Sequence, residues 1–210
     1  MESSLLLIQL FLAHILTDFV LQPTSWIEHK RKYKASSYLL IIHALLAGGL
    51  SLIFLQNWEL WYVAAFISIT HYLIDLWKLL QEKDNLTYFL LDQLFHLVII
   101  ILAWLYIIQG FDSVIPTLQS LLNSTEFLGI TAAYIIVIFP AGFLIGKATQ
   151  RWQNEIAEEY QKNSLEAAGR YIGIFERILV LTFILTNNFA AIGLLIAAKS
   201  ILRFSDKSET

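Results

Sequence analysis

The sequence predicts an all-α fold, a polytopic bundle of about seven transmembrane helices. Of its 210 residues, 57% are hydrophobic and only 15% are charged, and the mean hydropathy is +0.63. A soluble domain has about 25% charged residues, so the deficit favours a membrane protein. Apolar segments near the roughly 20 residues that a helix needs to cross a bilayer recur along the chain. Basic residues gather between alternate segments, as is typical of multi-pass membrane proteins.

Each apolar segment is expected to form one membrane-spanning helix. The first and the last two are short, and Asn187-Asn188 is the expected tight turn between the sixth and seventh. The first segment contains His14 and Asp18 and no basic residue precedes it, so we expect it to persist in the mature protein. The expected spans are residues 4–21, 37–55, 60–80, 86–108, 126–148, 171–187 and 188–204.

The whole chain, residues 1–210, is expected to form a single transmembrane domain. Residues 1–108 would supply four helices that carry His and Asp, and residues 109–210 three more, with a polar cytoplasmic hairpin at 149–170. The chain has no cysteine, which excludes disulfides and thiolate metal ligands. It also lacks the P-loop, GxSxG and HExxH motifs.

The positions of the basic residues predict the orientation of the bundle. All 14 Lys and Arg residues lie in or beside residues 22–36, 78–83, 147–177 and 199–207. Cytoplasmic loops carry the excess of Lys and Arg, so the N-terminus should be outside and the C-terminus cytoplasmic. We interpret the basic loop at 29–34 first as a topology determinant and second as an anionic-lipid contact, and expect no nucleic-acid partner.

Ionisable side chains inside the apolar segments form the candidate site. Four of the five histidines are intramembrane, and three helices carry a His and an Asp four residues apart, on one helix face. Counted from the cytoplasmic helix ends, these side chains occupy a slab roughly 5–15 Å deep. An ionisable group in lipid costs about 2.5–3.5 kcal/mol, so we expect them to converge inside the bundle. They are His14, Asp18, His43, His71, Asp75, Asp92 and His96.

The balance of these side chains favours a bound cation. The three aspartates have no matching set of basic residues inside the apolar segments, and one or two divalent metal ions with a protonated histidine would neutralise them. Imidazole and carboxylate ligands suit zinc, which we expect first, and also manganese or iron. The alternative is a structural His–Asp network, and Gln22, four residues after Asp18, could extend the site in either case. The expected metal ligands are His14, His43, His71, Asp75, Asp92 and His96.

A second polar set lies in the C-terminal third. Glu176 and Arg177 are near the start of the sixth expected helix, and Lys199 and Arg203 are near the end of the seventh. One interpretation is an ion pair between Glu176 and a basic neighbour, with the long side chains reaching toward the interface. The other is a substrate-binding subsite, in which the three basic side chains hold a phosphate or lipid head group and Glu176 orients them.

Several sequence strings resemble one bacterial membrane family, known only as domain of unknown function 3307. They are AHILTDFVLQP, IIHALLAGG, THYLIDLWK, LDQLFH, GRYIGIFERIL and AAIGLLIAAKSILRF. The resemblance extends over nearly the whole chain and is weakest over 109–162. It implies a location in the bacterial inner membrane and supplies no activity. The motif positions include the seven intramembrane His and Asp residues together with Glu176, Arg177, Lys199 and Arg203.

The function expected from the residues is that of a membrane-embedded, metal-dependent hydrolase. Asp18 would be a metal ligand or general base, and Glu176 is the second candidate catalytic carboxylate. The substrate would be membrane lipid or another amphipathic molecule with an anionic or phosphate group, entering from the cytoplasmic leaflet. One alternative is a divalent-cation or proton transporter or channel, which the apolar outer helix halves disfavour. Others are a structural network in a subunit of a larger complex and a haem protein, and the oligomeric state stays open, a homo-oligomer included.

Overall fold

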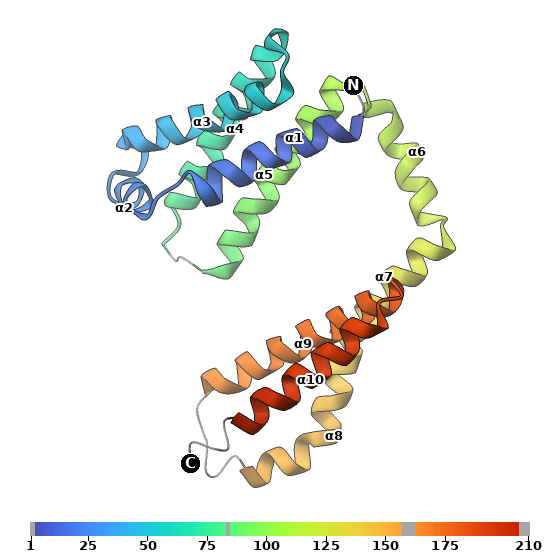
Figure 1. Cartoon of the computed structure of the whole chain (residues 1–210). Coiled ribbons are helices and arrows are strands. Elements are labelled where there is room, and N and C mark those ends of the chain that lie inside the picture. The colour runs from blue at the N-terminus through green and yellow to red at the C-terminus, as the bar shows by residue number, and fades with distance from the viewer. Residues whose placement is uncertain (1–2, 83–84, 157–162, 206–210) are drawn as a thin grey trace. The chain divides into compact units, whose positions relative to one another are not determined.

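The computed structural model describes residues 3–82, 85–156 and 163–205, with side chains outside 150–168 and 201–205. Within these ranges the chain is helical and contains no strand, which confirms the all-α fold. The chain divides into two compact units, Met1–Ile115 and Pro116–Thr210, and the boundary falls inside one helix. Each unit is described by itself (Figure 1).

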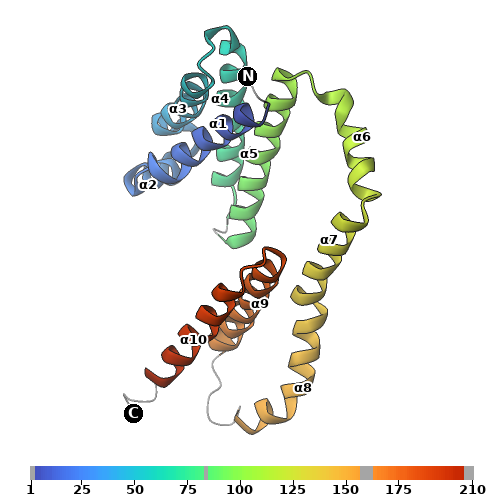
Figure 2. The same cartoon turned by 45° about the vertical axis from the view of Figure 1, so that its right-hand side comes forward.

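The first unit is an antiparallel ring of four long helices. Helix α1 packs against α3 and α5, and α4 packs against α3 and α5, so every long helix has two neighbours (Figures 1 and 2). Helix α2 is short, packs against α3 and lies at the end of the ring where α1 finishes. The helices are α1 (Ser3–Ile15), the π-helical turn η1 (Leu16–Val20), α2 (Thr24–Tyr33), η2 (Lys34–Ser36), α3 (Tyr38–Leu55), η3 (Trp58–Leu60), α4 (Trp61–Leu79) and α5 (Leu86–Ile107).

Helix ends in this unit follow from local sequence. Pro23 precedes α2 in an extended conformation, because proline lacks the N–H that a continuing helix needs. Gln56 ends α3 in the left-handed region, with φ of 53°. Asn85 starts α5, and its side-chain oxygen accepts a hydrogen bond from the Tyr88 N–H at 3.0 Å.

The outer surface of the ring exposes many large apolar side chains. Ile8, Leu45 and Ile69 are each more than 60% exposed on three different helices. An apolar surface of this extent is untypical of a soluble monomer and suits a bilayer. The buried apolar core lies in the half of the ring away from α2 and consists of Leu6, Leu10, Ala47, Leu55, Val63, Ile67, Ile100 and Ala103.

Helices α3 and α4 approach each other closely at Gly48. A Cβ atom at this position would lie 2.0 Å from the Ser68 Oγ and 2.3 Å from the Ala64 carbonyl oxygen. Only a residue without a side chain fits this crossing. The neighbouring Gly49 has open space where its Cβ would stand.

The second unit is built from the remaining helices. Helix α9 packs against α7, α8 and α10. Helices α7 and α8 are separated by Phe139, since Pro140 cannot continue the hydrogen-bond pattern of α7. The helices are α6 (Phe111–Leu122), which crosses the unit boundary, α7 (Thr125–Ile138), α8 (Pro140–Ile156), α9 (Asn163–Leu185) and α10 (Phe189–Ser205).

Five helical segments in the described residues are long and apolar enough to cross a membrane, and they match the first five expected spans. They are Ser3–Val20, Tyr38–Leu55, Trp58–Leu79, Leu86–Ile107 and Thr125–Thr149. The sixth and seventh expected spans fall on α9 and α10, and of these Phe189–Ser200 is a shorter apolar helix. The total of seven spans and the orientation therefore stay predictions.

Two stretches between the expected spans are helical. Residues 22–36 contain α2, and residues 109–125 contain α6. Both helices are amphipathic or polar, so neither has the continuous apolar run that predicts a membrane-spanning helix. The predicted hairpin at 149–170 has its arms in α8 and α9, while residues 157–162 between the arms lie outside the described part of the chain.

Candidate metal site

The first unit brings all seven predicted side chains into one buried cluster. Asp18 is the least buried of them, with its side chain 9% exposed, and His43 is fully buried. They come from four helices in antiparallel order, at the end of the ring nearest α2. The predicted convergence is thus confirmed. The cluster consists of His14 on α1, Asp18 on η1, His43 on α3, His71 and Asp75 on α4, and Asp92 and His96 on α5.

Asp18 lies at the centre of this cluster. Its Oδ1 is 3.3 Å from the His71 Nε2 and 3.4 Å from the His43 Nε2. Its Oδ2 is 3.8 Å from the His14 Nδ1 and 3.9 Å from the His96 Nε2. The carboxylate projects from a π-helical turn, a local widening of the helix that is common at functional sites. One carboxylate therefore faces all four imidazoles of the cluster.

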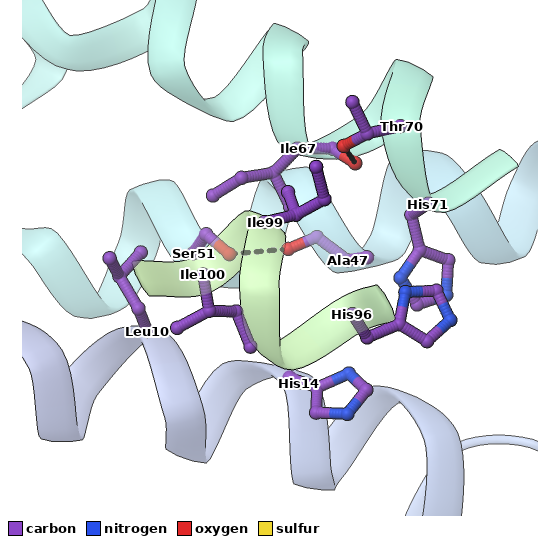
Figure 3. A pocket seen from close by; sticks show the side chains of 10 residues that line it. All are labelled: Leu10, His14, Ala47, Ser51, Ile67, Thr70, His71, His96, Ile99 and Ile100. Atoms are coloured by element: carbon purple, nitrogen blue, oxygen red, sulfur yellow. Dashed lines mark hydrogen bonds between the residues drawn. The ribbon is translucent and has the colours of Figure 1, made fainter. Parts of the chain in front are cut away.

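The imidazoles also contact one another. His71 stacks on His96 with ring centroids 4.2 Å apart and an angle of 20° between the planes. The His71 Nε2 lies 3.0 Å from the His43 Nε2, and the His14 ring centroid is 5.1 Å from that of His96. Figure 3 shows His71 and His96 against each other with His14 beside them. Four ring systems at these separations place several nitrogen lone pairs within the span of one or two metal ions.

Two lysines neutralise two of the three aspartates, which the sequence analysis did not anticipate. The Lys30 Nζ donates to the Asp75 Oδ2 at 2.7 Å, and both side chains are at most 8% exposed. The Lys78 Nζ donates to the Asp92 Oδ2, also at 2.7 Å. The premise that the aspartates have no basic partners was wrong. The basic run around Lys30 predicts a loop, whereas Lys30 lies on α2 and turns inward. The sequence does not indicate that Lys78, in the last turn of α4, pairs with Asp92.

Two glutamines complete the polar contacts. The Gln22 Nε2 lies 2.8 Å from the His43 Nε2, as the suggested extension of the site from Asp18 requires. The Gln93 Nε2 donates to the Asp92 Oδ2 at 3.1 Å and lies 3.5 Å from the Asp18 Oδ2. Gln93 was missed, although an amide next to Asp92 in an apolar helix was a visible signal.

The donor atoms of the cluster fit a metal ion. Among the described residues, four buried side-chain atoms have no hydrogen-bond partner, and three of them belong to this cluster: the Asp18 Oδ1, the Asp92 Oδ1 and the His96 Nε2. Such atoms cost about 1–3 kcal/mol each unless something binds them. Three sets have one ligand atom per residue, all within 4.8 Å of one another. The sets are His14, His71 and His96; Asp18, His43 and His71; and Asp75, Asp92 and His96.

A small void adjoins the imidazoles on the side away from α2. Its volume is about 10 Å³, at the lower limit for one water molecule. His14, His71 and His96 line one side of it (Figure 3). The other side is lined mainly by apolar side chains, among them Leu10, Ala47, Ile67, Ile99 and Ile100. The polar cluster is therefore closed by apolar packing at this end.

The polar residues predicted in the C-terminal third belong to the second unit. The Lys199 Nζ donates to the Glu176 Oε2 at 2.5 Å, and the lysine side chain is 66% exposed. The Arg177 Nε donates to the Val137 carbonyl oxygen at 2.7 Å, at the C-terminal end of α7. A cation at a helix C-terminus stabilises it. These contacts favour the ion-pair interpretation over the anion subsite, and the side chain of Arg203 lies outside the described residues.

The comparisons with known proteins give one match. The model of a family described as "Protein of unknown function (DUF3307)" matches residues 6–125, more than half of the chain. This range contains all seven residues of the cluster and both lysines, and it ends where α7 begins. No curated protein and no solved structure matches the chain.

Proposed function

The chain belongs to the DUF3307 family, whose function is unknown, and from this premise we propose that it is a membrane-embedded, metal-dependent hydrolase. The substrate would be a lipid-like or phosphorylated amphipathic molecule at the cytoplasmic leaflet of a bacterial inner membrane. One observation carries the proposal: imidazoles and carboxylates from four helices meet in one buried cluster that leaves three donor atoms without partners.

The ligand roles follow from how each carboxylate is oriented. Asp75 and Asp92 each give Oδ2 to a lysine, and their Oδ1 atoms lie 3.5 and 3.6 Å from the His96 Nε2. A metal ion could therefore bind both Oδ1 atoms without displacing either lysine. Zinc is the first choice for this donor set, with manganese or iron as alternatives.

Asp18 is the candidate general base. Its carboxylate faces the imidazoles and also lines a cleft that opens on the α2 side of the cluster. Asp18 can therefore contact both metal and substrate. A bound divalent ion would supply Lewis acidity and lower the pKa of a water molecule toward 7. The chain's own contribution would be to position that water against Asp18 and to exclude the rest of the solvent.

Metal content tests this proposal directly. Protein purified in detergent should contain near-stoichiometric metal by elemental analysis, and His71→Ala should lose most of it, because His71 belongs to two of the three ligand sets. The matched control is His29→Ala. His29 bonds the Ser37 hydroxyl at 2.8 Å and lies outside the ligand sets. A protein that stays folded, contains no metal and retains its function would rule out a metal-dependent hydrolase.

The second candidate is a structural network in a membrane subunit. The two lysine–aspartate pairs support it, since they already neutralise two of the three carboxylates without any metal. A protein that remains metal-free when supplied with zinc, manganese or iron would favour this network.

A transporter or channel is less well supported. A path across the membrane would have to cross the apolar core that packs above the void, including Leu6, Leu55 and Val63. Flux of a divalent cation or protons into proteoliposomes that His71→Ala abolishes would establish it nevertheless.

A further inference from the structure

A basic cleft opens on the α2 side of the first unit, directly onto the His/Asp cluster. Its volume is about 620 Å³, within the range of small-molecule sites. Asp18 and Asp75 line it, so it reaches the cluster itself. The basic residues in its lining are Lys30, Arg31, Lys34 and Lys78.

The net charge of this lining is positive and becomes more positive when the cluster binds a metal ion. The four basic residues face three acidic ones, Asp18, Asp75 and Glu82, which leaves a net charge of 4 − 3 = +1. A divalent ion bound to Asp18 or Asp75 would add two positive charges at the floor of the cleft. The cleft then favours an anion placed between the metal and the lysines.

Lys30 and Lys78 are placed to contact such an anion. Each ammonium has three N–H donors, and an aspartate Oδ2 accepts from one of them at 2.7 Å. Both lysines also line the cleft. Each can therefore hold its aspartate in position and still donate to an oxygen of a ligand, as lysines do in phosphate sites.

One wall of the cleft is aromatic and reaches the outer surface of the bundle. Phe19 and Phe89 both line it, their ring centroids are 6.4 Å apart, and Phe19 is 56% exposed. The Lys78 Nζ lies 5.3 Å from the centre of the Phe89 ring. An apolar chain on these rings would run along the surface that a bilayer covers. The ligand that suits the whole cleft is thus an anionic head on an apolar tail.

We propose that this cleft binds the phosphate group of an amphipathic ligand, with Lys30, Lys34 and Lys78 as its cations. The identification of the ligand as substrate rests on the proposed function, whereas the binding itself does not. The cleft places the anion subsite in the first unit. The sequence predicts it in the second unit, where Arg177 bonds a carbonyl group and Lys199 bonds Glu176.

Binding of two probes to the full-length protein tests the proposal and its source of phosphate. The probes are inorganic phosphate, and phosphatidic acid in phosphatidylcholine nanodiscs with pure phosphatidylcholine as reference. Lys78→Met should weaken phosphatidic acid binding about 10- to 100-fold, the loss of one charged hydrogen bond. Lys34→Glu should weaken it similarly without breaking an aspartate pair, because Lys34 is exposed on the rim.

The control is Lys32→Glu, which makes the same charge change two residues away. Lys32 is exposed, lies over the Tyr33 ring at 5.2 Å, and is outside the lining. It should bind as the wild type does. Binding of phosphatidic acid alone supports a lipid head group as the ligand, and equal binding of both probes supports recognition of phosphate itself.

Absence of binding by both probes would overturn the cleft proposal. So would binding that Lys34→Glu and Lys78→Met leave unchanged but Arg177→Met abolishes. Metal content measured on the same samples separates the two proposals: phosphate binding by protein that stays metal-free after zinc, manganese or iron is supplied supports the cleft and contradicts the hydrolase.

Discussion

Lys30 and Asp75 form an ion pair whose contribution to stability depends on its burial. The side chains are 5% and 8% exposed, and the Nζ to Oδ2 distance is 2.7 Å. Removing one partner of such a pair leaves a buried charge without compensation. The pair of Lys199 with Glu176 has a similar distance, but its side chains are 66% and 29% exposed, so breaking it should cost little stability.

Lys30→Met should accordingly destabilise the protein by about 3–5 kcal/mol. Lys199→Met should change stability by less than about 1 kcal/mol. Unfolding by denaturant in mixed micelles, followed by circular dichroism, measures both. The double variant Lys30→Met/Asp75→Asn should recover part of the loss, because it removes the uncompensated charge. Equal, small effects of both lysine variants would contradict this account of the buried pair.

Residue-scale prediction was successful for the histidines and aspartates and failed for the lysines. An ionisable group in an apolar segment is conspicuous, and its cost in lipid requires it to face inward. Lys30 lies in a basic run, where position in sequence does not distinguish a solvent-facing side chain from one turned toward Asp75. That choice depends on how α2 packs on the ring.

Among the elements, the α3–α4 pair depends on one glycine. A Cβ at Gly48 would stand 2.3 Å from the Ala64 carbonyl oxygen, which belongs to the backbone and cannot move aside cheaply. Gly49 offers a matched site on the same helix with open space. The string HALLAGG does not reveal which of the two glycines faces α4.

Gly48→Ala should therefore destabilise the first unit by about 1–3 kcal/mol, the usual cost of overpacking. Gly49→Ala should be neutral or stabilise by up to about 1 kcal/mol, since alanine is the better helix former. Thermal unfolding in detergent compares the two. A larger loss of stability from Gly49→Ala than from Gly48→Ala would contradict the close crossing of α3 and α4 at Gly48.

The sequence predicted the helices that consist of long, continuous apolar segments. The first four expected spans agree with α1–η1, α3, α4 and α5, because about 20 apolar residues in succession leave the backbone few alternatives to a helix. Helices α2 and α6 were not predicted, because an amphipathic helix appears in the sequence as a periodic pattern of apolar residues rather than as a continuous apolar run. The fifth expected span, 126–148, is interrupted at Phe139 and Pro140, because proline cannot continue the hydrogen-bond pattern of α7.

At the scale of the whole molecule, the distribution of basic residues predicts the orientation in the membrane. Lys30, Lys34 and Lys78 lie at the end of the ring that carries the polar cluster, and Glu59 lies in the connection at the opposite end. The positive-inside rule then places the cluster and its cleft near the cytoplasm. The substrate would reach them from the inner leaflet.

Single cysteines test this orientation without background, since the chain has none of its own. A membrane-impermeant maleimide should label Glu59→Cys in cells with a permeabilised outer membrane. Lys32→Cys should label only after the inner membrane is lysed. The reverse pattern would place the cleft on the outer face and would refute entry from the cytoplasmic leaflet.

The sequence alone predicted the helical fold, the helices long and apolar enough to cross a membrane, and the convergence of seven ionisable side chains, because the energetic cost of polar groups in lipid acts on each helix separately. Tertiary structure decided which groups neutralise that site. Asp18 faces four imidazoles, Lys30 turns in from α2, and the cleft forms between elements far apart in sequence. Distances between side chains depend on how helices cross and rotate, and composition or spacing along one helix carries no such information.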